Sequence, residues 1–285
     1  NELLSIIEDI KKKKFFSFDL ETSSLDYMEA KIVGISIALS DKKSYYIPIG
    51  HSSNIKYKQL SEKYVLDNLK PILQSEELKK IGHNLKYDRN VLVNYNINLV
   101  GIEHDSMLLS YVYDSTAIRH GLDNAAEKYL SHKTIHYEDV AGKGAKQIPF
   151  ADVDIDIAAE YACEDAVISL ELYNFLWSKV SKDKNIVKVY SDIEMPLVPI
   201  LSKIETNGVL IDSKALQKLS KDLDNELNEI ESKCFKITNK EFNLNSPKQL
   251  QEILYDELKI PVSKKTPTGK PSTDEDTLQF LAQTN

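Results

Sequence analysis

The sequence has few cysteines, no long apolar run and no excess of positive charge. Its 285 residues include only Cys163 and Cys234, too few for a disulfide framework or a zinc cluster. Such sparse use of cysteine suits a reducing cytoplasm. Neither the N-terminal stretch NELLSIIEDIKKKKFF nor any later one has the apolar core of a signal peptide or a membrane span. We therefore expect a cytoplasmic protein with no membrane partner.

The net charge of −8 argues against a protein held to nucleic acid mainly by bulk electrostatics. It leaves open a nucleic-acid enzyme, because carboxylates that chelate divalent cations add to the acidic count and phosphate contacts can be local. The sequence begins without Met and stops at TLQFLAQTN, inside a segment with apolar periodicity. We expect the chain to be a fragment of a longer protein.

The first half of the sequence alternates strand and helix patterns. KFFSFDL predicts a buried strand, and KIVGISIALS with KSYYIPIG predicts a hairpin. This mixture predicts an α/β domain in which helices pack on a central sheet. Asp105 is placed to cap one of the helices. Helical periodicity covers about residues 62–74, 84–95, 106–113, 121–130 and 156–180.

The sequence pattern of the second half differs from that of the first, and the change begins at SKDKNIVKVYSDIEMP. A polar, lysine-rich join is followed by a helix expected to begin near Ile193, and a further helix covers about 213–236. Ser246 can cap another helix, with Pro247 at its first position. We place a domain boundary near residue 186, so that residues 1–186 form one domain and 187–285 the helical start of another.

Acidic residues fall where strands and helices of the first domain should meet. Asp19 and Glu21 end the first strand, and residues i and i+2 of a strand point to the same face. The two carboxylates therefore converge at the edge where α/β sheets bind ligands. Asp88 falls early in a helix that Asn84 can cap. Each feature alone has a simpler explanation. Asp19 and Glu21 could be solvated at the end of a strand, and Asp88 could be an acid that interacts favourably with the helix dipole.

Tyr161 and Asp165 lie four residues apart on one face of the long helix, within an alanine-rich stretch. They could be a core tyrosine and a surface acid, but the alanines allow this face to approach the sheet closely. Together with the other three carboxylates, these two side chains could form a site for divalent cations. Two divalent cations about 3.5–4 Å apart can stabilise the attacking and leaving oxygens of a phosphoryl displacement. Hard oxygen ligands suit Mg²⁺ and Mn²⁺.

At these residues the chain resembles the 3′→5′ exonuclease domain of bacterial family A DNA polymerases. FDLETSSLD, GHNLKYDRNVL and EYACEDA correspond to the three motifs of the DEDD exonuclease superfamily, in its tyrosine subtype. Residues 119–150, which lie between these motifs, are similar to the exonuclease domain of these polymerases rather than to ribonuclease D. IEMPLVPILSKIETNGVLID and NLNSPKQLQEILYDELKIPVSKKTPTGKPST resemble the entry and thumb of the polymerase region. The resemblance implies a ribonuclease H-like α/β fold with a central mixed sheet at 1–186, then a truncated α-helical thumb at 187–285.

The resemblance also implies roles for the acidic positions. Asp19, Glu21 and Asp165 would ligate the more tightly held of two divalent ions, Mg²⁺ or in its place Mn²⁺. Asp19 would bridge to the second ion, which Asp88 approaches. Tyr161 would align the attacking water.

Further positions would contact DNA. Leu25 would wedge against the terminal base, and Asn84 would contact the backbone of the terminal nucleotide. Tyr137 stands where the family commonly has phenylalanine and would stack on the single-stranded end, which Arg119 also contacts. The lysine-rich segment 259–270 is either a phosphate contact of the thumb or a mobile polar loop. The DNA-contact residues implied in this way are Leu25, Asn84, Arg119, Tyr137, Lys264 and Lys265.

The function implied by the resemblance is two-metal proofreading, which releases nucleoside monophosphates from a single-stranded or frayed 3′ end of DNA. We expect a bacterial, nucleoid-associated monomer whose partners are DNA and the missing palm and fingers of the same polymerase. No polymerase activity is expected without the palm. Two alternatives stay open: a catalytically silent module that holds DNA or braces a polymerase, and an RNA-trimming enzyme of the ribonuclease D type.

Overall fold

The computed structural model describes residues 2–52, 57–117 and 119–284. The chain divides into two compact units, Asn1–Gly208 and Val209–Asn285, each described here by itself. Unit 1 is built on one five-stranded sheet of order β3-β2-β1-β4-β5. β1, β2 and β3 are antiparallel neighbours, whereas β1, β4 and β5 run parallel. The strands are β1 (Phe15–Thr22), β2 (Ile32–Ser40), β3 (Lys43–Pro48), β4 (Lys79–Gly82) and β5 (Ile102–Asp105).

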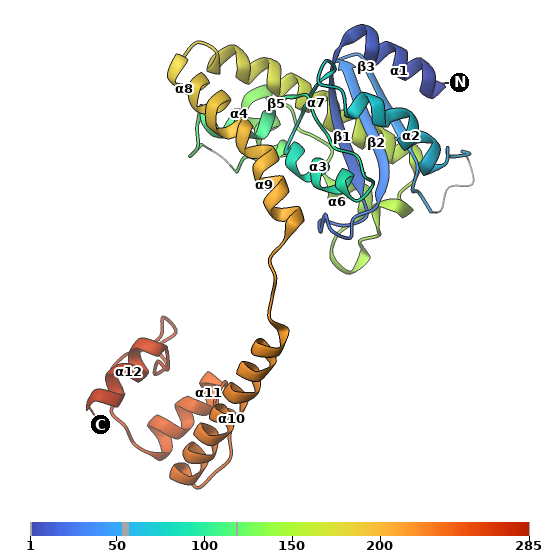
Figure 1. Cartoon of the computed structure of the whole chain (residues 1–285). Coiled ribbons are helices and arrows are strands. Elements are labelled where there is room, and N and C mark those ends of the chain that lie inside the picture. Colours follow the sequence, from blue (N-terminus) through green and yellow to red (C-terminus); the bar gives the residue numbers. More distant parts are fainter. Residues whose placement is uncertain (1, 53–56, 118, 285) are drawn as a thin grey trace. The chain divides into compact units, whose positions relative to one another are not determined.

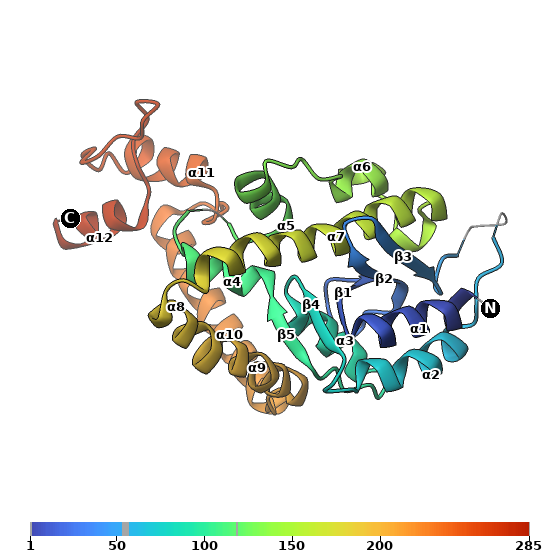
Figure 2. The same ribbon diagram turned by 90° about the horizontal axis from the view of Figure 1, so that it is seen from above.

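Helices cover both faces of this sheet (Figures 1 and 2). The long helix α7 (Ile155–Val180) packs across β1, β2 and β3 on one face. Helices α1 (Glu2–Lys13), α2 (Glu62–Leu73) and α3 (Leu85–Val93) share a core with the other face. β1 lies in the middle of the sheet and is covered on both sides, which explains why its sequence is a run of large apolar residues rather than an alternating one.

The remaining elements of unit 1 are short. They surround α7 and continue from its carboxyl end. Leu109, Leu172 and Tyr190 belong to a second core between α4, α7 and the helical run after α7. These elements are α4 (Ser106–Tyr113), α5 (Leu122–Ala125), the π-helical turn η1 (Ala126–Leu130), α6 (Tyr137–Ala141), the 3₁₀ turns η2 (Gly144–Lys146) and η3 (Phe150–Asp152), α8 (Lys184–Val189), the π-helical turn η4 (Tyr190–Glu194) and α9 (Met195–Asn207).

Unit 2 is helical. Its long helix α10 (Ser213–Thr238) begins at Asp212, whose carboxylate accepts hydrogen bonds from two backbone amides of the first turn. α11 (Pro247–Gln251) is capped by the Ser246 hydroxyl, as the sequence predicted. It continues into a π-helical turn, η5 (Glu252–Glu257), and α12 (Glu275–Thr284) ends the described part of the unit.

The fold class predicted from the sequence is confirmed: a mixed sheet flanked by helices, followed by a helical segment. The helix expected to begin near Ile193 is α9, which begins at Met195, but the sequence analysis missed α8 and η4 directly before it. The Asp183 carboxylate caps α8 through the amides of Asn185 and Ile186. The compact unit continues to Gly208, and the domain boundary near residue 186 stays a prediction. Within the described ranges, no helix is long and apolar enough to cross a membrane.

Candidate active site

The carboxyl end of β1 carries two acids that converge. Asp19 pairs with Ser36 of β2, and Glu21 follows two residues later on the same face of the strand. Asp165, from α7, completes a group of three: one carboxylate oxygen from each residue lies within 4.8 Å of the other two. The sequence-predicted convergence of the strand and the long helix therefore exists in the structure.

Small residues of α7 let this face reach the sheet. Ala158, Ala162 and Ala166 are fully buried, so the helix axis approaches the strands closely. Tyr161 and Asp165 lie one turn apart on this face, and their side chains are within hydrogen-bonding reach of each other. The helix thus presents a phenol and a carboxylate to the end of β1.

Asp88 lies behind the group of three rather than within it. It is in the first turn of α3 and only 2% exposed, and its Oδ1 accepts a hydrogen bond from the backbone amide of Leu20 at 2.9 Å. This bond ties α3 to β1 between Asp19 and Glu21. The fourth acid therefore approaches the site with one of its oxygens engaged by the strand.

Asp19, Glu21 and Asp165 line a pocket of about 600 Å³, a volume within the range of small-molecule sites. None of its described lining residues is Lys, Arg or His. A hollow of similar volume lies between α3 and α9, but its lining contains no carboxylate, so the chemistry favours the acidic pocket. The acidic pocket is lined by Asp19, Leu20, Glu21, Thr22, Ser23, Ser24, Leu25, Tyr87, Tyr137, Gln147, Tyr161 and Asp165.

Burial and mutual repulsion change the acidity of the site. Desolvation raises the pKa of Asp19 to about 6. The pKa values of Glu21, Asp88 and Asp165 are also raised, first by burial and then by the neighbouring carboxylates. The pKa of Tyr161 is raised by burial and by Asp165, so its phenol stays protonated.

This donor set fits a hard divalent cation. Three carboxylates offer oxygen ligands, they lie within 4.8 Å of one another, and the described pocket lining supplies no cationic side chain to neutralise them. Mg²⁺ and Mn²⁺ prefer such oxygen ligands.

The loop after β1 holds an apolar side chain at the mouth of the pocket. Leu25 is 94% exposed and lines the pocket. The Tyr87 hydroxyl lies 2.6 Å from Thr22 Oγ1 and donates a hydrogen bond to the backbone oxygen of Ser24. α3 therefore fixes the loop that presents Leu25.

Aromatic rings form the opposite wall. The rings of Tyr137 and Tyr161 meet edge to face with centroids 6.4 Å apart. Both also contact the buried ring of Phe150, at 6.1 Å and 5.9 Å. Tyr137 is 36% exposed and lines the pocket, so part of its side chain is accessible there.

Two other predicted DNA contacts lie outside this pocket. Asn84 lines a separate small hollow, and Arg119 is exposed away from the pocket lining. The expectation that the Asn84 side chain caps α3 was wrong: its backbone is left-handed, with φ +63°, and its side chain makes no capping bond. Asp105 caps α3 instead, by accepting hydrogen bonds from the amides of Asn84 and Leu85. Asp105 also caps α4, as the sequence predicted.

Lys264 and Lys265 belong to unit 2 and lie in an ordered turn. Lys264 pairs with Asp274 at 2.7 Å, with both side chains about half exposed. Lys265 forms a β-bridge with Pro271, and Gly269 supplies the positive φ of the turn between them. Their contact with phosphate stays a prediction.

Several residues of the site escaped the sequence reasoning. Tyr87 precedes Asp88 in the second motif, and its adjacency was the available signal. Gln147 and Phe150 lie in a loop with no periodicity. Glu164 is next to Asp165, but its contacts come from a segment some thirty residues earlier, which no local pattern reveals.

Known proteins are similar to this chain in sequence, and a solved structure is similar to it in fold. A family model described as 3′-5′ exonuclease matches residues 1–181, and one described as DNA polymerase family A matches 213–285. DNA polymerase I of Pseudomonas aeruginosa is 44% identical over 279 residues, covering 97% of this chain and 31% of that protein. DNA polymerase I of Borreliella burgdorferi is 38% identical over 282 residues, covering 99% of this chain and 30% of that protein.

The chain thus spans about 30% of the length of these relatives. Among solved structures, the POL domain of Pol1 from M. smegmatis, in complex with DNA primer-template and dNTP, has the same fold. The TM-score is 0.74 at 22% identity, and the match covers 100% of this chain and 44% of that one. The chain belongs to the 3′-5′ exonuclease family whose model matches residues 1–181, and its residues 213–285 match the model of DNA polymerase family A.

Proposed function

We propose that this chain hydrolyses the 3′-terminal phosphodiester of DNA and releases nucleoside monophosphates one at a time. The observation that carries the proposal is the group of Asp19, Glu21 and Asp165, which offer carboxylate oxygens within 4.8 Å of one another in a pocket whose described lining includes no Lys, Arg or His. The family match supports the direction of hydrolysis. In the longer polymerase, this activity would proofread the growing strand.

The residues of the pocket divide the chemistry among them. Asp19, Glu21 and Asp165 would hold divalent cations, with Asp88 behind them. When bound, these cations would stabilise the charge on the attacking and leaving oxygens. The protonated Tyr161 hydroxyl, beside Asp165, would orient the attacking water. As the water oxygen bonds to phosphorus, the bond to the preceding O3′ breaks, and that O3′ takes up a proton.

The walls of the pocket suit an unpaired terminal nucleotide. Leu25 and Tyr137 line the same pocket and offer apolar surfaces to its base. Stacking on an aromatic ring tolerates every base, which fits an enzyme that removes whichever nucleotide ends the strand. A frayed end would enter more readily than a paired one, since less unstacking is required.

A labelled oligonucleotide assay tests this function. The wild-type chain and an Asp19→Ala, Glu21→Ala variant would each be incubated with 5′-labelled single-stranded DNA and Mg²⁺ or Mn²⁺. We expect a stepwise ladder that requires metal and disappears in the variant. The same assay would be run with a 5′-labelled RNA oligonucleotide. Cleavage of RNA but not of DNA would favour the ribonuclease alternative, and no cleavage with either metal would favour a silent module.

A further inference from the structure

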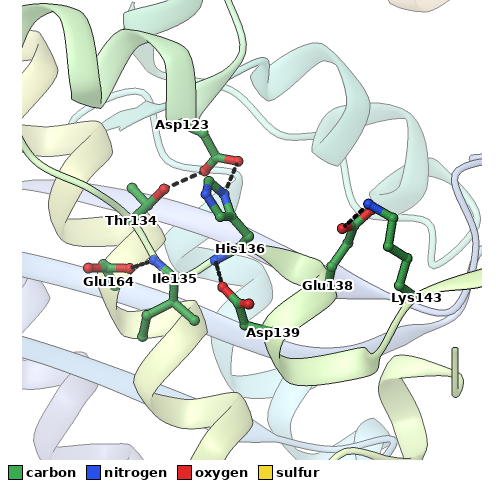
Figure 3. Close-up of polar contacts among 8 residues, drawn as sticks. All are labelled: Asp123, Thr134, Ile135, His136, Glu138, Asp139, Lys143 and Glu164. Carbon is green, nitrogen blue, oxygen red and sulfur yellow. Dashed lines mark hydrogen bonds and ion pairs between the residues drawn. The ribbon is translucent and has the colours of Figure 1, made fainter. Parts of the chain in front are cut away.

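The segment that carries Tyr137 is fastened to the helix that carries Asp165. We call residues 131–141 the Tyr137 segment; it follows η1 and includes α6, and Figure 3 shows part of its polar contacts. Glu164 of α7 accepts two hydrogen bonds from it, one on each carboxylate oxygen. His132 Nε2 lies 2.7 Å from Oε1, and the backbone amide of Ile135 lies 2.6 Å from Oε2. One side chain thus holds the segment at two points, three residues apart.

A second acid holds the same segment from α5. Asp123 accepts hydrogen bonds from the Thr134 hydroxyl at 2.6 Å and from His136 Nδ1 at 3.0 Å (Figure 3). Asp139 closes the turn by accepting the backbone amide of His136 at 3.1 Å. Thr134 is only 4% exposed, whereas the Asp123 side chain is 49% exposed, so this hydrogen bond is partly buried. The residues on both sides of Ile135 are therefore anchored as well.

The place of Glu164 on α7 links this fastening to the site. Glu164 precedes Asp165 directly and follows Tyr161 by three residues, so the same turn of helix presents the candidate metal ligand and grips the Tyr137 segment. Tyr137 lies two residues beyond Ile135, with its ring 6.4 Å from that of Tyr161. Glu164 is partly buried, with 19% of its side chain exposed.

We propose that Glu164 is a positioning residue, which sets the distance between the stacking ring of Tyr137 and the metal-binding carboxylates. This inference rests on the proposed exonuclease function. Glu164 is not among the described residues that line the pocket, and we infer that it acts through Tyr137. Without these two hydrogen bonds, the anchors to Asp123 and the ring contact between Tyr137 and Tyr161 remain, but Glu164 no longer holds the backbone beside Tyr137, so the ring is held less firmly beside the terminal base.

Kinetics on single-stranded oligo-dT test the proposal. In Glu164→Ala we expect KM to rise about tenfold, within the range for losing one base–aromatic stack, while kcat stays within about twofold. Glu164→Gln keeps an oxygen that can accept the Ile135 amide, so its effect should be smaller. Glu160→Ala is the matched control, because Glu160 is an exposed acid one turn earlier on α7. It should leave both constants unchanged.

A double-mutant cycle separates positioning from other roles. If Glu164 acts through Tyr137, then Glu164→Ala should add little to the loss already caused by Tyr137→Ala. Additive losses would overturn the proposal. So would a fall in kcat with unchanged KM, which would mean that Glu164 acts on Asp165 itself.

Amide hydrogen exchange gives a readout independent of activity. The Ile135 amide should lose protection in Glu164→Ala and keep it in Glu160→Ala; unchanged protection in both would overturn the proposal. Binding of fluorescein-labelled oligo-dT in EDTA completes the design, with weaker binding expected only for the Glu164 variants. If the wild type bound the oligonucleotide but did not cleave it, the proposed function would fail. The affinities of the wild type, the Glu164→Ala and Tyr137→Ala variants and the double variant would still decide the role of Glu164.

Discussion

Two groups of carboxylate oxygens lie at the ends of β1 and β5, two strands of the same sheet that β4 separates, and the two groups differ in their hydrogen-bond partners. Asp105, at the end of β5, is 1% exposed and accepts hydrogen bonds from four backbone amides, those of Asn84, Leu85, Met107 and Leu108. The acids at the end of β1 have one another for neighbours and no cationic side chain in the described pocket lining.

The difference separates an acid that caps two helices from the acids that we propose to be functional. A buried charge is costly unless it is paired or hydrogen-bonded. Asp105 meets this need with two helix starts, so its negative charge organises α3 and α4. The group of Asp19, Glu21 and Asp165 meets it only in part, and its raised pKa values reflect the cost. The comparison predicts that one site requires an external cation and the other does not.

The largest expected effect concerns activity. Asp165→Asn should lower the rate of 3′ hydrolysis more than about a hundredfold, because loss of even an indirect partner of a metal ligand costs up to that much. The measurement is single-turnover cleavage of 5′-labelled DNA in saturating Mg²⁺. An Asp165→Asn variant with the wild-type rate would break the distinction between the two acids.

The second effect concerns stability and should be largest at the structural acid. Asp105→Ala removes two helix caps at about 1 kcal/mol each and leaves buried amides unpaired. We expect a loss of about 2–4 kcal/mol in the free energy of unfolding, measured by urea denaturation without metal. Asp19→Ala serves as the control and should not destabilise the metal-free protein. Equal losses in both variants would mean that the acids of the pocket are structural too.

The third effect is the pH dependence of the metal-free protein. The pKa of Asp19 is about 6 in the folded chain and near 3.8 when unfolded, so the folded state binds more protons between these values. Its contribution to stability is full below pH 3.8 and is lost as the pH rises through about 6. Mn²⁺ should therefore raise the melting temperature more at pH 8 than at pH 5. A metal effect independent of pH would contradict this.

The smallest effect is expected beside Asp105 and has the opposite sign. Burial lowers the pKa of His104 to about 4, among the rings of Tyr173, Trp177 and Tyr190. Its contribution to stability is present above pH 6.5 and is lost as the pH falls through about 4. Replacing His104 by Phe should flatten the acid limb of the unfolding free energy. If this limb is unchanged, the histidine is not held neutral by the fold.

The sequence was most informative where one pattern extended over many residues. The apolar run of β1, the hairpin and the long helix α7 followed from periodicity, and the acids followed from their motifs. The short parallel strands were missed: β4 and β5 have four residues each, and KKIG and IEHD are largely polar. Their pairing depends on neighbours distant in the sequence.

Contacts between distant segments also explain the other differences. Asn84 looked like the cap of α3, but Asp105, twenty-one residues later, supplies the acceptor. A local sequence pattern can suggest only a nearby side chain as the cap of a helix. In the folded chain, the cap of α3 is a carboxylate that the sheet places next to its first turn. The hydrogen bonds of Glu164 to the Tyr137 segment have the same cause, since Glu164 follows His132 by 32 residues and Ile135 by 29.

The most direct test of this account is a calorimetric titration of Mn²⁺ into the whole chain, beside the Asp19→Ala, Glu21→Ala variant and Asp105→Asn. We predict saturable binding to the wild type, no binding to the double variant and wild-type affinity for correctly folded Asp105→Asn. Equal binding to the wild type and the double variant would contradict the assignment of the cation site to the end of β1.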